Sequence, residues 1–242
     1  MTAYVITLSN NEESVKSAEK TIESAKDVGY QFPIKKFEAI KPSEWNKILP
    51  YENEFHSYKR PDNVAACFAS HYLLWKKCVE LNEPILILEH DAIFRENIPN
   101  IDFNMCVNFG RPSYIRPHHM IYEETKDGLN WPNQVNFLGH HGYAIKPEAA
   151  KIFCEDVKTR VLTANDTWIE RVTYPWLEEY RPFPIHADTD FTTVQMIEDL
   201  EEVKPDKKWE EILDVKFPYY EWLMDTFPHI LHTRQSQRWI NA

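Results

Sequence analysis

The tripeptide Glu89-His90-Asp91 is the strongest candidate for chemistry in this sequence, because it places two carboxylates directly after a predicted buried strand. The four aliphatic residues 85–88 before it are typical of a strand in the middle of a mostly parallel sheet. Ligands of open α/β sheets bind at the carboxyl ends of such strands. Two neighbouring carboxylates repel each other, and Mg²⁺ or Mn²⁺ relieves this repulsion by coordination. The tripeptide therefore predicts a divalent metal site, and the alternative is an acidic turn in solvent.

Histidines elsewhere in the chain are weaker candidates. His118-His119 and His140-His141 are adjacent pairs, and neighbouring side chains of a strand point to opposite faces. Neither pair is therefore expected to chelate a metal by itself. His71 lies on the apolar face of a predicted helix, where a hydrogen-bonded core residue is the commoner outcome and a ligand is the alternative.

The elements that must position these residues alternate between strands and helices. Residues 4–8 are rich in strand formers, residues 12–28 carry one apolar stripe, and residues 36–40 read as a second strand. A right-handed crossover makes this pair of strands parallel. The remaining expected elements are a helix capped by Asp62 and ending before Pro84, strands at 105–109, 135–138, 142–145 and 182–186, and a helix beginning at Pro147.

Three segments lack a clear strand or helix pattern. Residues 43–61 are polar and aromatic, which predicts a loop. Residues 111–134 are rich in aromatic residues and proline, as expected of a functional lid or a platform for a sugar acceptor. Residues 198–211 are dominated by charge, which predicts a solvated helical face or an insertion.

Composition excludes several classes of protein. The 242 residues are 43% hydrophobic and 27% charged, as in an ordinary soluble globular protein. Only five glycines and no GxGxxG or GKT/GKS stretch argue against a dinucleotide-binding fold. The net charge of −11 disfavours a nucleic-acid-binding surface. Four widely spaced cysteines predict reduced thiols, and no signal peptide or apolar run of ~20 residues is found, so a cytoplasmic protein is expected.

Three motifs occur in order along the chain. Residues 66–75 read A-C-F-A-S-H-Y-L-L-W, residues 88–92 read L-E-H-D-A, and residues 142–150 read G-Y-A-I-K-P-E-A-A. Together with the opening strand, they resemble glycosyltransferase family 25, which includes lipooligosaccharide and collagen galactosyltransferases. Two departures are that His90 replaces an acidic residue and that residues 10–13 replace the arginines often found there. The compact, acidic form also resembles phage-encoded relatives of this family.

The resemblance implies an α/β domain of GT-A type over residues 1–195, with a Rossmann-like, mostly parallel sheet flanked by helices. A charged helical extension over residues 196–242 would pack on the same domain. The implied reaction is an inverting transfer of a sugar from a nucleotide-sugar, a UDP-sugar first of all. Mn²⁺ or Mg²⁺ would be bound by Glu89 and Asp91. His232 is a candidate third ligand, and a surface histidine is the alternative.

The resemblance also suggests where donor and base would lie. The nucleotide-sugar is expected to contact residues at the strand ends and on the helix that follows, namely Leu8, Ser9, Asn10, Ser70, His71, Glu89 and His90. Inversion requires a general base near the acceptor hydroxyl, and Asp166 is the first candidate, with Asp188 and Asp190 next. Asp166 could also be a plain helix cap, and Ser70 and His71 could simply pack beneath the site.

Other functions remain open on the sequence alone. The same chemistry could act on a hydroxymethylated base of phage DNA, which requires a basic groove that reaches a flipped base and is disfavoured by the net charge. The acceptor would otherwise be a glycan. A non-catalytic sugar- or nucleotide-binding module with the same fold is a second class. A metal-dependent hydrolase of nucleotide sugars is a third.

Overall fold

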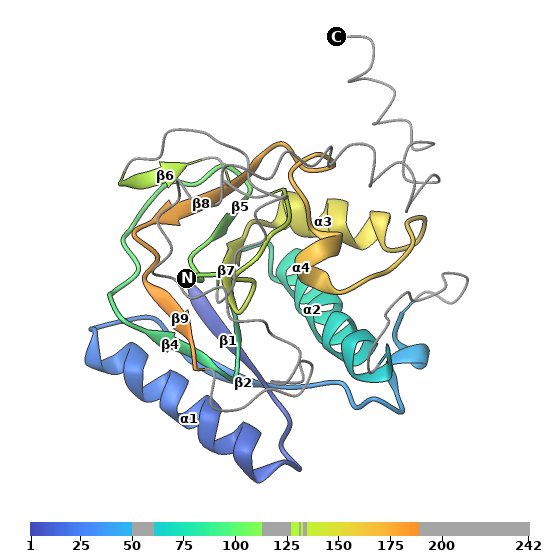
Figure 1. Cartoon of the computed structure of the whole chain (residues 1–242), viewed down its shortest axis with the longest axis horizontal. Coiled ribbons are helices and arrows are strands. Elements are labelled where there is room, and N and C mark those ends of the chain that lie inside the picture. The colour runs from blue at the N-terminus through green and yellow to red at the C-terminus, as the bar shows by residue number, and fades with distance from the viewer. Residues whose placement is uncertain (50–60, 113–126, 131, 133–134, 189–242) are drawn as a thin grey trace, which may run out of the picture.

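The computed structural model describes residues 1–49, 61–112, 127–130, 132 and 135–188 (Figure 1). Several predictions fall outside these residues: those for Asp190, His232, the segment 198–211 and the extension 196–242, and most of the loop 111–134. Among the described residues, no helix is both long and apolar enough to cross a membrane. The four cysteines are free thiols.

A seven-stranded sheet forms the centre of the fold, in the order β2-β1-β3-β7-β5-β8-β6. Its strands are β1 (Thr2–Thr7), β2 (Ile34–Glu38), β3 (Ile85–Glu89), β5 (Cys106–Asn108), β6 (Gly128–Asn130), β7 (Gly142–Ile145) and β8 (Leu177–Arg181). Strands β1, β2, β3, β5 and β8 point one way, and β7 and β6 run against them. The predicted α/β class with a mostly parallel sheet is therefore confirmed. A separate ribbon pairs β4 (Ala92–Phe94) with β9 (Ile185–Ala187).

Helices cover both faces of the sheet (Figure 1). They are α1 (Glu12–Asp27), α2 (Pro61–Leu81), α3 (Pro147–Asp156) and the short α4 (Asn165–Trp168), with a 3₁₀ turn η1 at Trp45–Lys47. Alternate residues of β3 divide the core between the two faces, since successive side chains of a strand point in opposite directions. Ile85 and Ile87 pack with Trp75 of α2 and Phe153 of α3. Leu86 and Leu88 pack on the other side with residues of α1.

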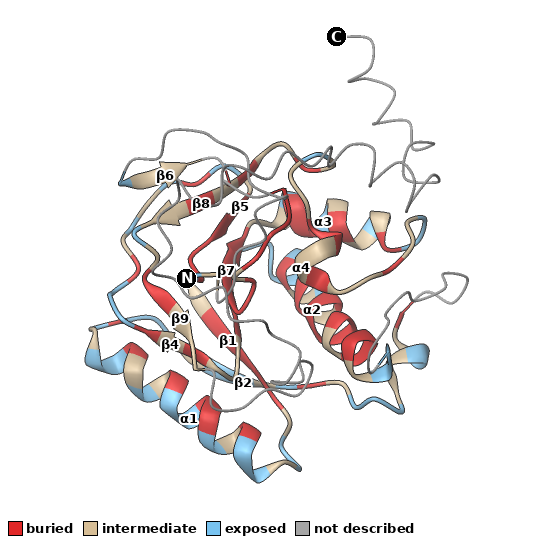
Figure 2. Ribbon diagram, in the orientation of Figure 1, coloured by how far each residue is buried: buried red, intermediate tan, exposed pale blue. Residues whose placement is uncertain are grey.

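Figure 2 shows the consequence for burial: the central strands and the inner face of α2 are buried, whereas α1 exposes its outer face. Helix α1 begins after Asn11, whose side chain caps the helix by accepting a hydrogen bond from the Ser14 backbone N–H at 3.0 Å. Helix α2 begins at Pro61 rather than after an Asp62 cap. Asp62 instead lies in the first turn and accepts a hydrogen bond from Trp45 Nε1 at 2.9 Å.

Other strand boundaries differ from the predictions. Strand β2 begins and ends two residues before the predicted 36–40. Residues 135–138 form no strand, and Asn136 makes only an isolated bridge to Glu170. The last predicted strand begins at Ile185 rather than at 182, and β8 was not predicted.

Strand β7 lies antiparallel between β3 and β5, and its register decides what lies beside the end of β3. Gly142 pairs with Leu88, so the turn before β7 passes the carboxyl end of β3, and the backbone N–H of Glu89 donates to the carbonyl of His141 at 2.9 Å. A Cβ atom on Gly110 would lie 1.9 Å from the carbonyl oxygen of Gly139. Glycine at position 110 therefore permits the close backbone contact that holds this turn in place.

Candidate active site

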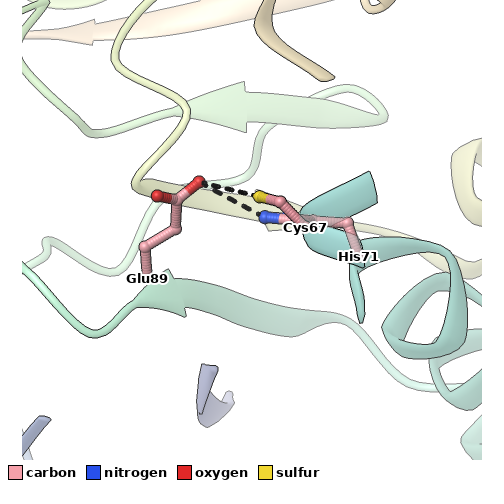
Figure 3. A group of neighbouring side chains, drawn as sticks. All are labelled: Cys67, His71 and Glu89. Carbon is pink, nitrogen blue, oxygen red and sulfur yellow. Dashed lines mark hydrogen bonds and ion pairs between the residues drawn. The ribbon is translucent and has the colours of Figure 1, made fainter. Parts of the chain in front are cut away.

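Glu89 lies at the centre of the site, at the carboxyl end of β3. Its Oε1 atom lies 3.4 Å from His71 Nε2, 3.7 Å from His140 Nδ1 and 4.0 Å from Cys67 Sγ. We call these four residues the Glu89 cluster. Only one carboxylate oxygen faces Cys67 and His71, and the other points away from them (Figure 3). The second oxygen is therefore not used by these two neighbours.

Local structure explains why these residues meet. Cys67 and His71 are four residues apart on α2, so their side chains lie on the same face of the helix. Glu89 follows Ile85 and Ile87 in strand alternation, so its side chain leaves β3 on the face that α2 covers. His140 comes from the turn before β7.

A buried hydrogen-bond chain supports His71 from behind. Trp75 Nε1 donates to the Tyr143 hydroxyl at 2.7 Å, and this hydroxyl lies 3.0 Å from His71 Nδ1. The rings of His71 and His140 lie with their centroids 4.3 Å apart, and Tyr143 stacks on both. The imidazole of His71 therefore has a fixed orientation that leaves Nε2 directed at Glu89.

The charge state of the cluster follows from burial and from these contacts. Burial acts to raise the pKa of Glu89, but the imidazoles of His140 and His71 beside its carboxylate outweigh burial and hold this pKa well below its ordinary value. Burial, assisted by the charge of His71, lowers the pKa of His140 to about 4. Burial and then the charge of Glu89 raise the pKa of Cys67 well above its ordinary value. Without a metal, the cluster at neutral pH holds a carboxylate, a neutral His140 and a protonated thiol.

Asp91 is the second carboxylate of the predicted metal site, and it lies in the turn after β3. Its Oδ1 atom is buried and has no hydrogen-bond partner among the described residues. Burial and then the charges of Glu89 and Asp188 raise the pKa of Asp91 well above its ordinary value. A buried carboxylate oxygen without a partner, near two further carboxylates, has the donor chemistry that a divalent cation requires. The residues present therefore fit Mn²⁺ or Mg²⁺.

The structure places the two described base candidates on different elements. The backbone N–H of Asp188 donates to the carbonyl of Asp91 at 2.7 Å, and its carboxylate pairs with Lys20 at 3.3 Å. Asp166 lies in the first turn of α4, whose N-cap is Ala164, so the interpretation of Asp166 as the helix cap is wrong. The Asp166 charge acts on both Cys67 and His140. Asp166 therefore lies near the Glu89 cluster.

A hollow of about 440 Å³ opens at the carboxyl ends of β1 and β2. Its lining contains two of the predicted donor-site residues and four others, namely Leu8, Asn10, Asn11, Lys41, Pro42 and Ser43. It lies next to Glu89, because Ile6, two residues before Leu8, pairs with Glu89 across β1 and β3. The sequence did not single out Lys41, since nothing in the chain around it marks a site.

The remaining predicted donor-site residues have backbone or supporting contacts. The backbone N–H of Ser9 donates to Glu38 at 3.3 Å. The buried Ser70 hydroxyl accepts from the Ile40 backbone N–H at 2.9 Å and donates to the Ala66 carbonyl at 2.8 Å, so it holds the end of β2 against α2. The carbonyl of His90 accepts from the Thr21 hydroxyl at 2.7 Å, which attaches the turn to α1.

Sequence reasoning missed Cys67 and His140 as members of the site. The signal for Cys67 was present, because it lies four residues before His71 on the predicted helix. His140 was discounted as half of an adjacent pair in a strand, but it lies in a turn, where strand alternation does not apply.

Comparisons with known proteins agree with the motifs over the first part of the chain. Residues 1–108 match the family described as glycosyltransferase family 25 (LPS biosynthesis protein). The lipooligosaccharide biosynthesis protein lic2B of Haemophilus influenzae is 34% identical over 100 residues, which are 39% of this chain and 35% of that protein. The chain thus matches about a third of that relative's length.

One solved structure has weak overall similarity to this chain. It is a glycosyltransferase involved in the glycosylation of the major capsid of PBCV-1, with a TM-score of 0.32 and 10% identity, over 72% of this chain and 83% of that one. The family match spans β1, β2, β3 and β5 with the helices between them, and so includes Cys67, His71, Glu89 and Asp91. Over residues 1–108, the resemblance of this chain to glycosyltransferase family 25 is therefore confirmed.

Proposed function

We propose that this chain is a metal-dependent glycosyltransferase that moves a sugar from a nucleotide-sugar to an acceptor hydroxyl. The observation that carries the proposal is the buried Asp91 carboxylate, which has an oxygen without a described partner and lies near Glu89 and Asp188. This acidic site is next to the hollow at the ends of β1 and β2. A cation site beside a hollow at the strand ends is the arrangement that binding of a nucleoside diphosphate requires.

The donor would bind with its nucleoside in the hollow and its diphosphate toward Asp91. Asn10 offers an amide group and Asn11 offers its amide N–H groups for pairing with a base such as uracil, and Lys41 offers a positive charge for a phosphate. Glu89 and Asp91 would hold Mn²⁺ or Mg²⁺. A cation bound there would neutralise the charge that develops on the leaving diphosphate.

The acceptor hydroxyl must lose a proton as it attacks the sugar from the side opposite the leaving group. We propose that the carboxylate of Asp166 accepts this proton. Asp166 belongs to α4, whereas Glu89 and Asp91 lie at the end of β3, and its charge acts on His140 of the Glu89 cluster. Asp188 is the second candidate for the base, and its backbone hydrogen bond to Asp91 supports a position beside the proposed metal instead. We also propose that the transfer inverts the configuration at the anomeric carbon of the sugar.

The proposed acceptor is a glycan. The relative lic2B takes part in lipooligosaccharide biosynthesis, and a glycan acceptor needs no basic surface on the enzyme. A modified base in DNA is less well matched, since the chain has a net charge of −11 and DNA contacts rely on Lys and Arg.

A thermal-shift screen with UDP-, GDP-, CMP- and TDP-sugars tests the donor site. Each donor is added with Mn²⁺ and, separately, with EDTA, because a ligand that binds only the native state raises the melting temperature. We expect stabilisation by a UDP-sugar with Mn²⁺ that EDTA removes. No shift with any donor would exclude the site. Stabilisation without transfer to any glycan would indicate a binding module, and release of free sugar would indicate a hydrolase.

A further inference from the structure

The distances within the Glu89 cluster are unusual for a hydrogen-bonded network. Glu89 Oε1 is 3.4 Å from His71 Nε2 and 4.0 Å from Cys67 Sγ. The nitrogen–oxygen distance exceeds the usual hydrogen-bond range of about 2.7–3.2 Å. Two ligands of one tetrahedral zinc ion, with bonds of about 2.0–2.3 Å, lie roughly 3.3–3.6 Å apart. The His71–Glu89 separation lies in this range, and the Cys67–Glu89 separation is a few tenths of an ångström longer. Cys67, His71 and Glu89 each offer one atom that could bind a metal, and these three atoms lie within 4.8 Å of one another.

We propose that Cys67, His71 and Glu89 form a zinc-type metal site, which differs from the proposed hard-cation site at Asp91 but shares Glu89 with it. The three residues supply a thiolate sulfur, an imidazole nitrogen and a carboxylate oxygen, which is a donor set for Zn²⁺ rather than for Mg²⁺. Three protein ligands leave the fourth position of a tetrahedral ion for water or a substrate oxygen.

Glu89 can serve both sites because a carboxylate has two oxygens. Oε1 faces Cys67 and His71, whereas the other oxygen points away from them (Figure 3). The second oxygen thus remains for a cation shared with Asp91. His140 stacks against His71 and approaches Oε1 to 3.7 Å, so it closes one side of the cluster.

The surroundings of His71 match those of a metal-binding histidine. Such a histidine binds the metal through one ring nitrogen and is oriented by a hydrogen bond from the other. His71 Nδ1 lies 3.0 Å from the Tyr143 hydroxyl, which Trp75 holds from the other side. With a metal on Nε2, the proton resides on Nδ1 and is donated to Tyr143.

A metal-free network is the competing arrangement. In it, the Tyr143 hydroxyl donates to His71 Nδ1, and the proton on Nε2 faces Glu89. This arrangement leaves Cys67 as a thiol at 4.0 Å from the carboxylate and places the His71 proton in a long contact. The two arrangements differ in one measurable property, namely whether the Cys67 sulfur is bonded to a metal.

Cobalt spectroscopy measures this property. The full chain is treated with a chelator and then titrated with Co²⁺, which occupies zinc sites and gives a near-ultraviolet charge-transfer band when a thiolate is a ligand. We expect this band to saturate at one equivalent, to disappear on addition of Zn²⁺ and to persist in excess Mg²⁺. The Cys67→Ser variant should lack the band. The matched control is Cys154→Ser, at a half-buried thiol on α3, and it should retain the band.

Absence of the band from the wild-type protein would overturn the proposal, and so would a band that survives in Cys67→Ser. If Cys67→Ser fails to fold, a band that persists in Cys154→Ser still assigns the thiolate ligand to Cys67. The two remaining cysteines, Cys78 and Cys106, are fully buried in the core. The proposal of a zinc-type site can be tested independently of glycosyl transfer. Asp91→Asn should lose transfer but keep the cobalt band, so failure of one site is distinguishable from failure of the other.

Discussion

Nε2 of His71 lies 3.4 Å from Oε1 of Glu89, and this contact joins the buried face of α2 to the carboxyl end of β3. Two motifs that are separate in the sequence, at residues 66–75 and 88–92, therefore meet in one site. The other oxygen of Glu89 points away from Cys67 and His71 (Figure 3).

Replacement of Asp91 by Asn should abolish sugar transfer with little effect on folding. The substitution removes a carboxylate from the proposed cation site, and loss of transition-state charge stabilisation of this kind costs about 10²–10³-fold in kcat. Folding should be unharmed, since burial and the charges of Glu89 and Asp188 already disfavour the ionised form of this side chain. Steady-state transfer with Mn²⁺ measures the effect. The control is Asp27→Asn at the exposed end of α1. Retention of more than about a tenth of the wild-type rate would contradict the role of Asp91 as a metal ligand.

Replacement of Gly110 by Ala should destabilise the fold more than replacement of Gly142 by Ala. A Cβ atom at position 110 would lie 1.9 Å from the Gly139 carbonyl oxygen, which is backbone and cannot move alone. At position 142 the nearest atom is Ile185 Cδ1 at 2.8 Å, the end of a flexible side chain. We expect a loss of about 1–3 kcal/mol for Gly142→Ala and more for Gly110→Ala.

Urea unfolding at equilibrium measures both losses. The double variant Gly142→Ala/Ile185→Val should recover part of the stability of Gly142→Ala, because it shortens the side chain that the new methyl group meets. Equal losses in the two single variants would show that the turn at 139–141 does not depend on the backbone contact between Gly110 and Gly139.

The parts of the fold that could be predicted are those in which apolar residues recur with the period of a helix or form the continuous run of a buried strand. The aliphatic run before Glu89 predicts β3, and the apolar stripe of residues 12–28 predicts α1. Strand β8 could not be predicted in this way, because one of its inward positions is Glu179, whose charge is paired with Arg181 at 2.7 Å. Val135, Phe137 and Leu138 are apolar and buried, but among the described residues this segment has no partner strand, and apolar residues alone do not supply one.

The candidate site could be predicted in part for a related reason. Glu89 and Asp91 lie close together in sequence, so their spacing alone indicates a common site. His140 reaches Glu89 only because β7 runs antiparallel to β3 in a particular register, which depends on contacts between distant segments. No local pattern around residue 140 encodes that register.

Acidification should destabilise the metal-free protein between about pH 6.5 and 4. Burial lowers the pKa of both His140 and His141 to about 4, so the folded state holds them neutral. The stability they contribute is complete above the unfolded pKa of about 6.5 and is lost as the pH falls toward the folded value. The full shift corresponds to about 3 kcal/mol per histidine.

The free energy of unfolding in EDTA, measured by urea titration across this range, tests the prediction. The variant His141→Asn removes one of the two titrating groups and should lose stability less steeply with acid than the wild-type protein. Identical slopes for the two proteins would show that His141 is not held neutral by the fold.

Replacement of Tyr143 by Phe should weaken both the fold and the proposed zinc site. The hydroxyl accepts from Trp75 Nε1 at 2.7 Å and lies 3.0 Å from His71 Nδ1, and all three side chains are buried. An unsatisfied buried donor costs about 1–3 kcal/mol. Loss of the hydrogen bond to a metal-binding histidine weakens metal affinity by about 10–100-fold. Cobalt titration and urea unfolding measure the two effects, and an unchanged affinity for Co²⁺ would contradict the supporting role of Tyr143.

The variants Asp166→Asn and Asp188→Asn should affect different kinetic constants. Asp166 is the proposed base, and its loss should lower kcat by about 10²–10⁴-fold while the KM for the donor stays unchanged. Asp188 is held against Asp91 by a 2.7 Å backbone hydrogen bond and pairs with Lys20, so its loss should mainly raise the KM for the donor. Steady-state kinetics with the UDP-sugar varied at saturating acceptor separates the two constants. The reverse pattern would assign the base to Asp188 and return Asp166 to a structural role in α4.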